Sequence, residues 1–475
     1  MHRTKIVCTI GPATNSRERM RALMHAGMNA ARINFSHGDH DAHRESIATL
    51  RDVAEQERCL VAIIADLQGP KLRVGDIEDE PMELQKGSLI TLSPAPRSSS
   101  EDEIPIPHPE LLRDLSAGQT VLLDDGELTL TVERRGDGGS LKARVLTGGP
   151  LTSHKGINVP GAQLSFSSLT EKDKEDARFA LEQGVDCFAL SFVRRAADVR
   201  ELRHFLKSNG ADNPFIIAKI EKPEALSDFD QILAQSDGIM VARGDLGVET
   251  PAEEVPFHQK ELIESCNRSG KPVITATQML QRMIEHPRPT RAEASDVANA
   301  ILDGTDAVML SGETAIGDYP IRATEMMATI CANAEAHLPH SRLVECGTDC
   351  YDVTTEAISL SAVDIAREVD ARAIVTATMT GTTARMVARH RPSVPIVAVT
   401  PNERILYRMA LVWGVIPVEV PEFTTTDEMV EMMVKAARDE GLVGWGDRVV
   451  LTAGIPFGQG NKTNMLKVHV MGEGA

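Results

Sequence analysis

Positive charge is scarce in this 475-residue sequence, in which 50 Lys and Arg stand against 69 Asp and Glu, a formal net charge of −19. No Lys/Arg-rich block stands out either. Both features argue against nucleic acid as a partner, because proteins that bind it gather basic residues into patches. An acidic protein that binds an anionic substrate must concentrate its cations locally. We therefore expect a few well-placed Arg and Lys side chains to bind the anion.

Cysteine is also sparse, and its spacing excludes the common metal motifs. None of the seven Cys residues forms a C-x-x-C pair. Cys346 and Cys350 lie close together, but no second pair or His cluster completes a zinc site. Cys8, Cys59 and Cys187 sit in or beside apolar runs, which is typical of core thiols. We therefore expect reduced cysteines and a cytoplasmic protein.

Membrane and P-loop signals are missing as well. No apolar stretch is long enough to span a bilayer, and residues 1–5 lead straight into a strand-like run rather than a signal peptide. The motif G-x-x-x-x-G-K-[ST] is absent. Gly458–Thr463 resembles it loosely, but the spacing is wrong and the following chain has a strand-like pattern. These absences argue against a membrane protein and against a P-loop enzyme.

The sequence does contain an alternation of short β-branched runs and longer amphipathic stretches. At roughly 150 residues per domain its length predicts about three domains, and a hydrophobic content of 42% can fill large cores. Continuous apolar runs are typical of strands buried on both faces, and eight β-then-α units in order predict a closed parallel (β/α)8 TIM barrel. The expected strands are Lys5–Ile10, Ala30–Asn34, Val61–Asp66, Cys187–Phe192, Phe215–Ile220, Gly238–Ala242, Pro272–Ala276 and Ala307–Leu310.

Two segments depart from this alternation. The segment after the third strand carries Gly, Pro and Ser clusters and short alternating runs, so we expect a small inserted β domain that could close over a site. The last part of the chain alternates helix and strand again, which predicts an open α/β domain. The expected boundaries are 1–69 and 156–336 for the barrel, 70–155 for the inserted lid and 337–475 for the C-terminal domain.

Polar side chains follow the predicted barrel strands at their C-terminal ends, where active sites of this fold lie. Lys219 and Glu221 alternate with Ile220 and so share one face of a strand. A structural ion pair would explain them, because a Lys within an apolar run is costly unless paired. The functional interpretation is a phosphoryl clamp beside a Mg²⁺ ligand, with Asp245 as a second oxygen ligand. No Cys or His competes, so zinc is not expected.

The loop Arg243–Gly247 precedes a short helical pattern and carries two glycines. Glycines let backbone N–H groups approach an anion, and a helix N-terminus favours negative charge. An ordinary turn would show the same residues. Thr277 alone is a weaker signal, and His37 is more typical of a capped loop histidine than of a catalytic base.

Several segments, spread in order over nearly the whole chain, carry a specific resemblance. They are Lys5–Ala13, Ala31–Gly38, Lys155–Gly161, Ala218–Glu221, Met240–Glu249 and Pro287–Pro320. Together they resemble the pyruvate kinase family. The resemblance implies transfer of the phosphoryl group of phosphoenolpyruvate to ADP, giving pyruvate and ATP in glycolysis, with Mg²⁺ (or Mn²⁺ in its place) as cofactor. It also implies a homotetramer and a phosphorylated effector at the C-terminal domain.

The resemblance assigns roles around the substrate. Arg32 would hold the phosphate of phosphoenolpyruvate, and Lys219 would stabilise the phosphoryl group in flight. The backbone amides of Gly244 and Asp245 would take the substrate carboxylate. Thr277 would border the substrate and the route of proton delivery.

The same resemblance assigns the metal and the nucleotide. Glu221 and Asp245 would bind Mg²⁺. Arg73 and Lys155, at the two hinges of the inserted domain, would reach the nucleotide phosphates together with Asn34.

Two positions depart from the family pattern. A monovalent-cation pocket would be lined by Asn34, Ser36 and Asp66, and many family members carry Glu where this chain has Lys71. Those with Lys tend not to need K⁺, because an ammonium can supply the charge itself; a Lys71 that pointed to solvent would do nothing. The C-terminal loop Thr378–Thr383 lacks the Lys or Arg of members that bind sugar phosphates, so we expect a monophosphate effector rather than a bisphosphate.

Two other functions are compatible with parts of this pattern. A barrel aldolase or mutase can also handle enolpyruvate through Mg²⁺, but it needs no nucleotide lid. A catalytically inactive homologue that senses metabolites would be expected to lose Lys219, Glu221 or Asp245, and all three are present.

Overall fold

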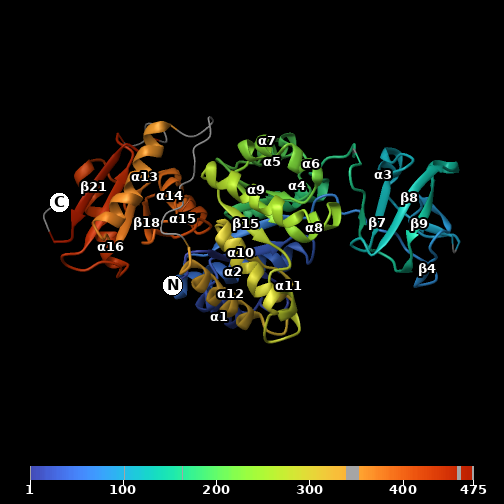
Figure 1. Cartoon of the computed structure of the whole chain (residues 1–475), viewed down its shortest axis with the longest axis horizontal. Coiled ribbons are helices and arrows are strands. Elements are labelled where there is room, and N and C mark those ends of the chain that lie inside the picture. Colours follow the sequence, from blue (N-terminus) through green and yellow to red (C-terminus); the bar gives the residue numbers. More distant parts are fainter. Residues whose placement is uncertain (1, 101, 163, 339–351, 457–461, 473–475) are drawn as a thin grey trace.

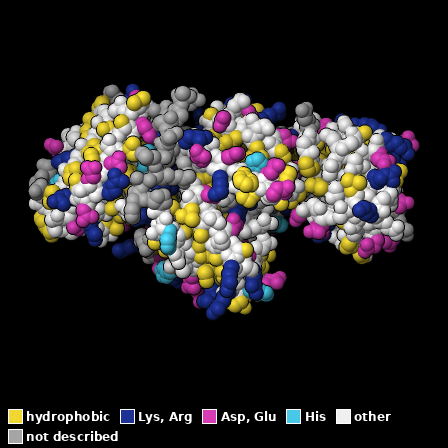
Figure 2. Space-filling model, in the orientation of Figure 1, with side chains coloured by type: hydrophobic (Ala, Val, Ile, Leu, Met, Phe, Trp, Pro, Cys, Tyr) yellow, Lys and Arg dark blue, Asp and Glu magenta, His cyan; other side chains and the backbone are white. Residues whose placement is uncertain are grey.

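The computed structural model describes residues 2–100, 102–162, 164–338, 352–456 and 462–472. They form three bodies in a row, with a central barrel, a small β domain at one side and an α/β domain at the other (Figure 1). On the face seen in Figure 2, Lys and Arg are interspersed with Asp and Glu over all three bodies. No helix among the described residues is both long and apolar enough to cross a bilayer.

The central body is the predicted (β/α)8 barrel. In the described chain its parallel strands close in the order β1-β16-β15-β14-β13-β12-β3-β2. The strands are β1 (Lys5–Ile10), β2 (Ala30–Asn34), β3 (Ala62–Leu67), β12 (Cys187–Leu190), β13 (Phe215–Ile220), β14 (Gly238–Ala242), β15 (Val273–Ala276) and β16 (Ala307–Leu310). Their residues are almost all buried, as continuous apolar runs predict.

The helices of the barrel follow its strands, and the longer ones cover its outer face. They are α1 (Arg17–Ala26), α2 (His40–Glu57), α4 (Glu171–Glu182), α5 (Ala196–Ser208), α6 (Pro223–Ser227), α7 (Phe229–Gln235), α8 (Arg243–Glu249), α9 (Val255–Arg268), α10 (Arg291–Asp303), α11 (Gly312–Ala315) and α12 (Pro320–Glu335). Capping chemistry sets several of their ends. For example, α10 begins with a reciprocal capping box between Thr290 and Glu293 and ends at Gly304 with a φ of 103°.

One predicted barrel strand extends two residues too far at its end. The apolar run Cys187–Phe192 predicts a strand to its end, but β12 stops at Leu190. The chain turns there because Phe192 adopts a φ of 56°, in the left-handed region. This turn brings the Ser191 side chain and the Phe192 backbone N–H toward the strand ends of the barrel.

The β domain follows β3, as expected, and projects away from the barrel (Figure 1). Its larger sheet has the order β11-β7-β8-β9-β5-β6, and a two-stranded sheet pairs β10 with β4. Its elements are β4 (Met82–Leu84), β5 (Leu89–Ser93), β6 (Glu103–Pro105), α3 (Pro109–Asp114), β7 (Thr120–Leu123), β8 (Leu128–Arg135), β9 (Leu141–Thr147), β10 (Gly149–Leu151) and β11 (Ile157–Asn158). Its core is separate from that of the barrel.

The C-terminal body is the predicted open α/β sheet, in the order β19-β18-β17-β20-β21 with β21 antiparallel to β20. Its elements are α13 (Val353–Glu368), β17 (Ala373–Ala377), α14 (Thr382–Ala388), β18 (Ile396–Thr400), α15 (Glu403–Met409), β19 (Val415–Glu419), α16 (Thr426–Asp439), β20 (Arg448–Ala453) and β21 (Met465–Val470). Cys346, Cys350 and most of the rejected P-loop segment lie outside the described residues.

Candidate active site

Strands β2, β3 and β13 bring four charged side chains together at their C-terminal ends. Lys219 Nζ lies 3.0 Å from Glu221 Oε1 and 3.2 Å from Asp66 Oδ1. Arg32 Nε donates to Asp66 Oδ2 over 2.6 Å. The Lys219 side chain is 10% exposed, and the two carboxylates are almost fully buried. Arg32, Asp66, Lys219 and Glu221 are called the charged cluster below.

Barrel pairing explains why these residues meet. Asn34 lies opposite Asp66 in the register of β2 and β3, and β12 separates β3 from β13. Ser191, directly after β12, bridges that gap. Its hydroxyl accepts a hydrogen bond from Lys219 Nζ over 2.6 Å and donates to Leu67 O over 2.7 Å. Ser191 was missed in the sequence, where its one signal is a polar residue near the end of an apolar run.

Lys219 and Asp66 hold each other ionised. Burial lowers the pKa of Lys219, but the carboxylates of Asp66 and Glu221 outweigh it, and the net pKa lies above the ordinary value. Burial raises the pKa of Asp66, and the nearby Lys219 and Arg32 reverse that effect. Lys219 therefore stays an ammonium at neutral pH. A fixed, dehydrated cation is suited to stabilising the charge on a phosphoryl group during transfer.

Glu221 has the surroundings of a cation ligand. Its Oε2 accepts the Phe192 backbone N–H over 2.8 Å. Its pKa is raised by burial and by the nearby carboxylate of Asp245, against the opposing effect of Lys219. A hard cation bound by both carboxylates would relieve the repulsion between them. Within the described residues no group of three or more His, Cys, Asp and Glu could hold a metal. A hard cation usually takes more oxygen ligands than two carboxylates provide.

The start of α8 lies beside Thr277. The Gly244 N–H donates to Thr277 Oγ1 over 2.7 Å. A Cβ at position 244 would sit 3.2 Å from that oxygen, so glycine permits the close approach. Thr277 has a φ of 65°, and the Arg243 guanidinium donates to its carbonyl over 2.9 Å. Arg243 therefore holds this strained turn in place, a role that the sequence did not indicate.

Further cations surround the mouth of the cluster. Lys71 is half-buried; its pKa is lowered by burial and by Arg73, while Asp245 acts in the opposite direction. The pKa of His37 is lowered by burial and by Lys71, Arg73 and Arg32. Arg32, Lys71 and Arg73 therefore all act electrostatically on His37. An acidic protein has thus concentrated cations locally, as an anionic substrate requires.

The other residues expected around the nucleotide and the monovalent cation have partners within the protein. Arg73 pairs with Gly156 in an isolated β-bridge, so the two connections to the β domain run side by side. Lys155 Nζ lies 2.8 Å from Asp124 Oδ1. Asn34 Oδ1 accepts the Ser36 N–H over 3.2 Å. Both oxygens of Asp66 already contact cationic groups of the cluster.

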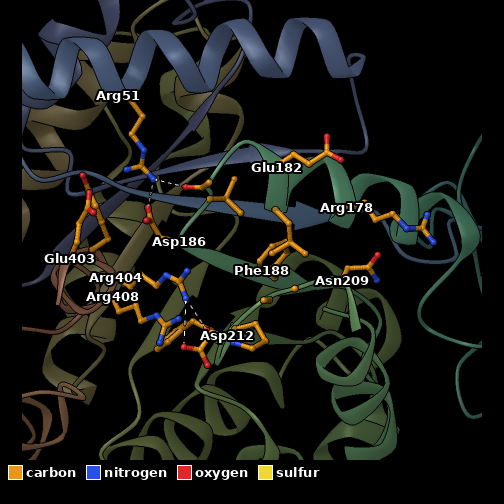
Figure 3. A pocket seen from close by; sticks show the side chains of 18 residues that line it. Arg51, Arg178, Glu182, Asp186, Phe188, Asn209, Asp212, Glu403, Arg404 and Arg408 are labelled. Atoms are coloured by element: carbon orange, nitrogen blue, oxygen red, sulfur yellow. Dashed lines mark hydrogen bonds and ion pairs between the residues drawn. The ribbon is translucent and has the colours of Figure 1, made fainter. Parts of the chain in front are cut away.

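A separate cavity of about 530 Å³ lies at the opposite end of the barrel, against α15 (Figure 3). Its charges are largely satisfied within the protein. Arg51 Nη2 donates to Asp186 over 2.8 Å, and its guanidinium lies 4.4 Å from the ring centroid of Tyr407. Arg404 lies beside Asp212. Since (β/α)8 enzymes react substrates at the C-terminal strand ends, this cavity is not the candidate site.

Comparison with known proteins identifies relatives over almost the whole chain. The family domain described as "Pyruvate kinase, barrel domain" matches residues 1–324, and "Pyruvate kinase, alpha/beta domain" matches residues 356–469. Pyruvate kinase of Geobacillus stearothermophilus is 50% identical over 99% of this chain and 81% of its own length. That of Bacillus licheniformis is 47% identical over 100% of this chain and 81% of its own length. A crystal structure of a pyruvate kinase from Cryptosporidium parvum superimposes with a TM-score of 0.91 at 36% identity, covering 99% of this chain and 96% of that one.

Proposed function

Because the chain belongs to the pyruvate kinase family, we propose that its charged cluster carries out the reaction of that family. The enzyme transfers the phosphoryl group of phosphoenolpyruvate to ADP and forms pyruvate and ATP in glycolysis. The observation that carries the site assignment is the buried Lys219 ammonium, held between Asp66 and Glu221 at the strand ends. Pyruvate formation that requires ADP, together with its loss on substitution of Lys219, tests the assignment.

Substrate binding follows from the local charges. Arg32 receives the phosphate of phosphoenolpyruvate at the edge of the cluster. The carboxylate faces the first turn of α8, whose amides have no partners within the helix. Gly244 N–H already donates to Thr277 in this structure, so Asp245 N–H is the amide better able to receive the carboxylate. The ADP phosphates are taken by Arg73, Lys155 and Asn34.

The transfer step needs positioning and charge neutralisation more than covalent chemistry. An oxygen of the ADP β-phosphate attacks, and the bond between phosphorus and the enol oxygen breaks. Lys219 stabilises the group in flight, and the leaving electrons form the enolate of pyruvate. A proton then adds to its methylene carbon beside Thr277. Closure of the β domain excludes water that would otherwise accept the phosphoryl group.

The family is generally dependent on a divalent metal. We assign Mg²⁺, with Mn²⁺ as a substitute, to Glu221 and Asp245. When bound, the ion supplies neutralisation of the charge on the phosphoryl and enolate oxygens. The mutual repulsion of the two carboxylates supports this assignment.

The enzyme is predicted to work without added K⁺. Lys71 is only partly exposed, which supports a side chain that lies against the protein rather than in open solvent; burial and Arg73 lower its pKa, and Asp245 acts in the opposite direction. Two unit charges about 5 Å apart at an effective dielectric of about 20 interact by roughly 3 kcal/mol, enough to replace a cation in the pocket of Asn34, Ser36 and Asp66. Activity is measured in tetramethylammonium salts free of Na⁺ and K⁺, with and without KCl.

Little change on adding KCl is the expected result, and Lys71→Glu is expected to create a K⁺ requirement. A rise of about tenfold or more in the parent enzyme would refute the role of Lys71, because this corresponds to about 1.4 kcal/mol that the ammonium fails to supply. Lys86→Glu, at an exposed position on the β domain, is the matched control for the charge reversal.

Regulation by a bisphosphorylated sugar is predicted to be weak. The hydroxyls of the loop Thr378–Thr383 mostly bond one another or the loop backbone, as in the 2.9 Å bond from Gly381 N–H to Thr378. The guanidinium of Arg385, two residues beyond the loop, lies 3.4 Å from Thr382 Oγ1. We therefore propose a monophosphate effector. Rates at low phosphoenolpyruvate with fructose 1,6-bisphosphate, ribose 5-phosphate or AMP test this; strong activation by micromolar bisphosphate contradicts it.

We also propose a cytoplasmic homotetramer divided at 1–69 with 156–336, 70–155 and 337–475, with the second boundary moved past β11 because Ile157–Asn158 pairs with β7 in the sheet of the β domain. The free thiols of Cys8, Cys59, Cys187, Cys266 and Cys331 support a reducing compartment. Light scattering coupled to size exclusion measures the assembly.

A further inference from the structure

A buried carboxylate joins the β domain to the barrel. Glu249, the last residue of α8, has a side chain only 1% exposed. Its Oε1 forms an ion pair with Lys222 Nζ and also accepts a hydrogen bond from Asn158 Nδ2 over 2.7 Å. These three residues are called the latch.

The partners of Glu249 belong to different bodies. Asn158 lies in β11 and pairs with Leu122 of β7 in the sheet of the β domain. Lys222 follows β13 of the barrel, directly after Glu221, and its Nζ lies 5.4 Å from the ring centroid of Phe192. Gly126, in the turn after β7, approaches the same helix: a Cβ there would lie 3.8 Å from Val248.

The ion pair and the hydrogen bond of Glu249 differ in the free energy that their loss would cost. A buried carboxylate without a cation is strongly unfavourable, so the Lys222 pair must persist whenever Glu249 stays buried. The Asn158 bond is between a neutral amide and a carboxylate that is already neutralised. It can break without leaving an unpaired buried charge. The barrel half of the latch is therefore fixed, and the half contributed by the β domain is detachable.

We propose that Glu249 is a positioning residue for the nucleotide. By holding Asn158 it fixes the β domain against α8, the helix that carries Asp245, and so sets the position of Arg73 and Lys155 relative to that helix. This inference rests on the proposed nucleotide roles of Arg73 and Lys155. Phosphoenolpyruvate contacts barrel groups only, so loosening the latch affects ADP far more than phosphoenolpyruvate.

The test introduces a negative charge at Asn158, the residue that the β domain contributes to the latch. Asn158→Asp is nearly isosteric but places a second carboxylate against Glu249, with one Lys222 to neutralise both. We expect the KM for ADP to rise at least tenfold, with the KM for phosphoenolpyruvate and the melting temperature nearly unchanged. Adding Glu249→Gln exchanges the amide and the carboxylate between the two positions. The amide of Gln can donate to the carboxylate of Asp, and Lys222 again has one negative charge to neutralise. The double variant is expected to return the KM for ADP to within about threefold of the parent.

Gln85→Glu is the matched control, because it adds the same charge at an exposed position on the β domain. An unchanged KM for ADP in Asn158→Asp overturns the proposal. Equal losses for both substrates that the double variant does not rescue also overturn it, since they indicate a merely structural contact. Arg73→Ala distinguishes the proposed nucleotide role of Arg73 from the role of the latch. If Arg73→Ala leaves the KM for ADP unchanged while Asn158→Asp raises it, the nucleotide assignment fails and the latch stands.

Discussion

Replacing Lys219 by methionine is expected to lower kcat by about 10²–10³-fold or more, the typical loss when a preorganised electrostatic contact to the transition state is removed. The ammonium lies within 3.2 Å of both Asp66 and Glu221, so its position is fixed before the substrate arrives. Arg32 remains paired with Asp66 in the variant, but Glu221 loses its cation, so the melting temperature is expected to fall while the fold survives. Turnover is measured by coupling pyruvate formation to lactate dehydrogenase, and folding by thermal melting.

A second reaction distinguishes phosphoryl transfer from the later protonation of the enolate. Exchange of the methyl protons of pyruvate with solvent involves no phosphoryl group, so Lys219→Met is expected to retain part of it. Lys207→Met, at an exposed position of α5, controls for the loss of a lysine. Near-normal kinase turnover in Lys219→Met would remove Lys219 from the transfer step.

Removing one charge from each proposed metal ligand is expected to shift the Mg²⁺ requirement strongly. Glu221→Gln and Asp245→Asn each leave a hard cation with one carboxylate instead of two. Since even outer partners of metal ligands contribute about 10- to 100-fold in affinity, we expect the midpoint of activation to rise by at least that amount. Gln at position 221 can still accept the Phe192 N–H, so the local turn is preserved.

The measurement is activity titrated against Mg²⁺ at saturating substrates, repeated with Mn²⁺. Glu253→Gln carries the same charge change at an exposed position near the end of α8 and is expected to leave the midpoint in place. If both ligand variants keep the midpoint of the parent enzyme, neither carboxylate holds the metal.

Local patterns in the sequence were sufficient to predict the barrel. Strand β13 was predicted to the residue, and the alternation of Lys219 with Glu221 correctly put both on one face, 3.0 Å apart. That alternation is a local property of a strand, so one segment contains all the information needed. The polar strand ends likewise predicted that charged side chains gather at one end of the barrel, as Asp66, Lys219 and Glu221 do.

Contacts between distant segments could not be predicted from local sequence patterns. The pairing of Asp66 with both Lys219 and Arg32 depends on which strands become neighbours when the barrel closes. Ser191 turns into the cluster because Phe192 leaves the strand with a positive φ, which its residue type does not favour. Lys222 and Asn158 meet at Glu249 only after two bodies have packed together.

Pyruvate formation in a lactate dehydrogenase-coupled assay tests the central claim most directly. Purified protein is supplied with phosphoenolpyruvate, ADP and Mg²⁺ in tetramethylammonium buffer, and each component is withheld in turn. We predict that pyruvate forms with an equal amount of ATP, only when all three are present and without K⁺, and that Lys219→Met abolishes nearly all of it. Pyruvate released without ADP, or at an undiminished rate in Lys219→Met, would contradict phosphoryl transfer at the charged cluster.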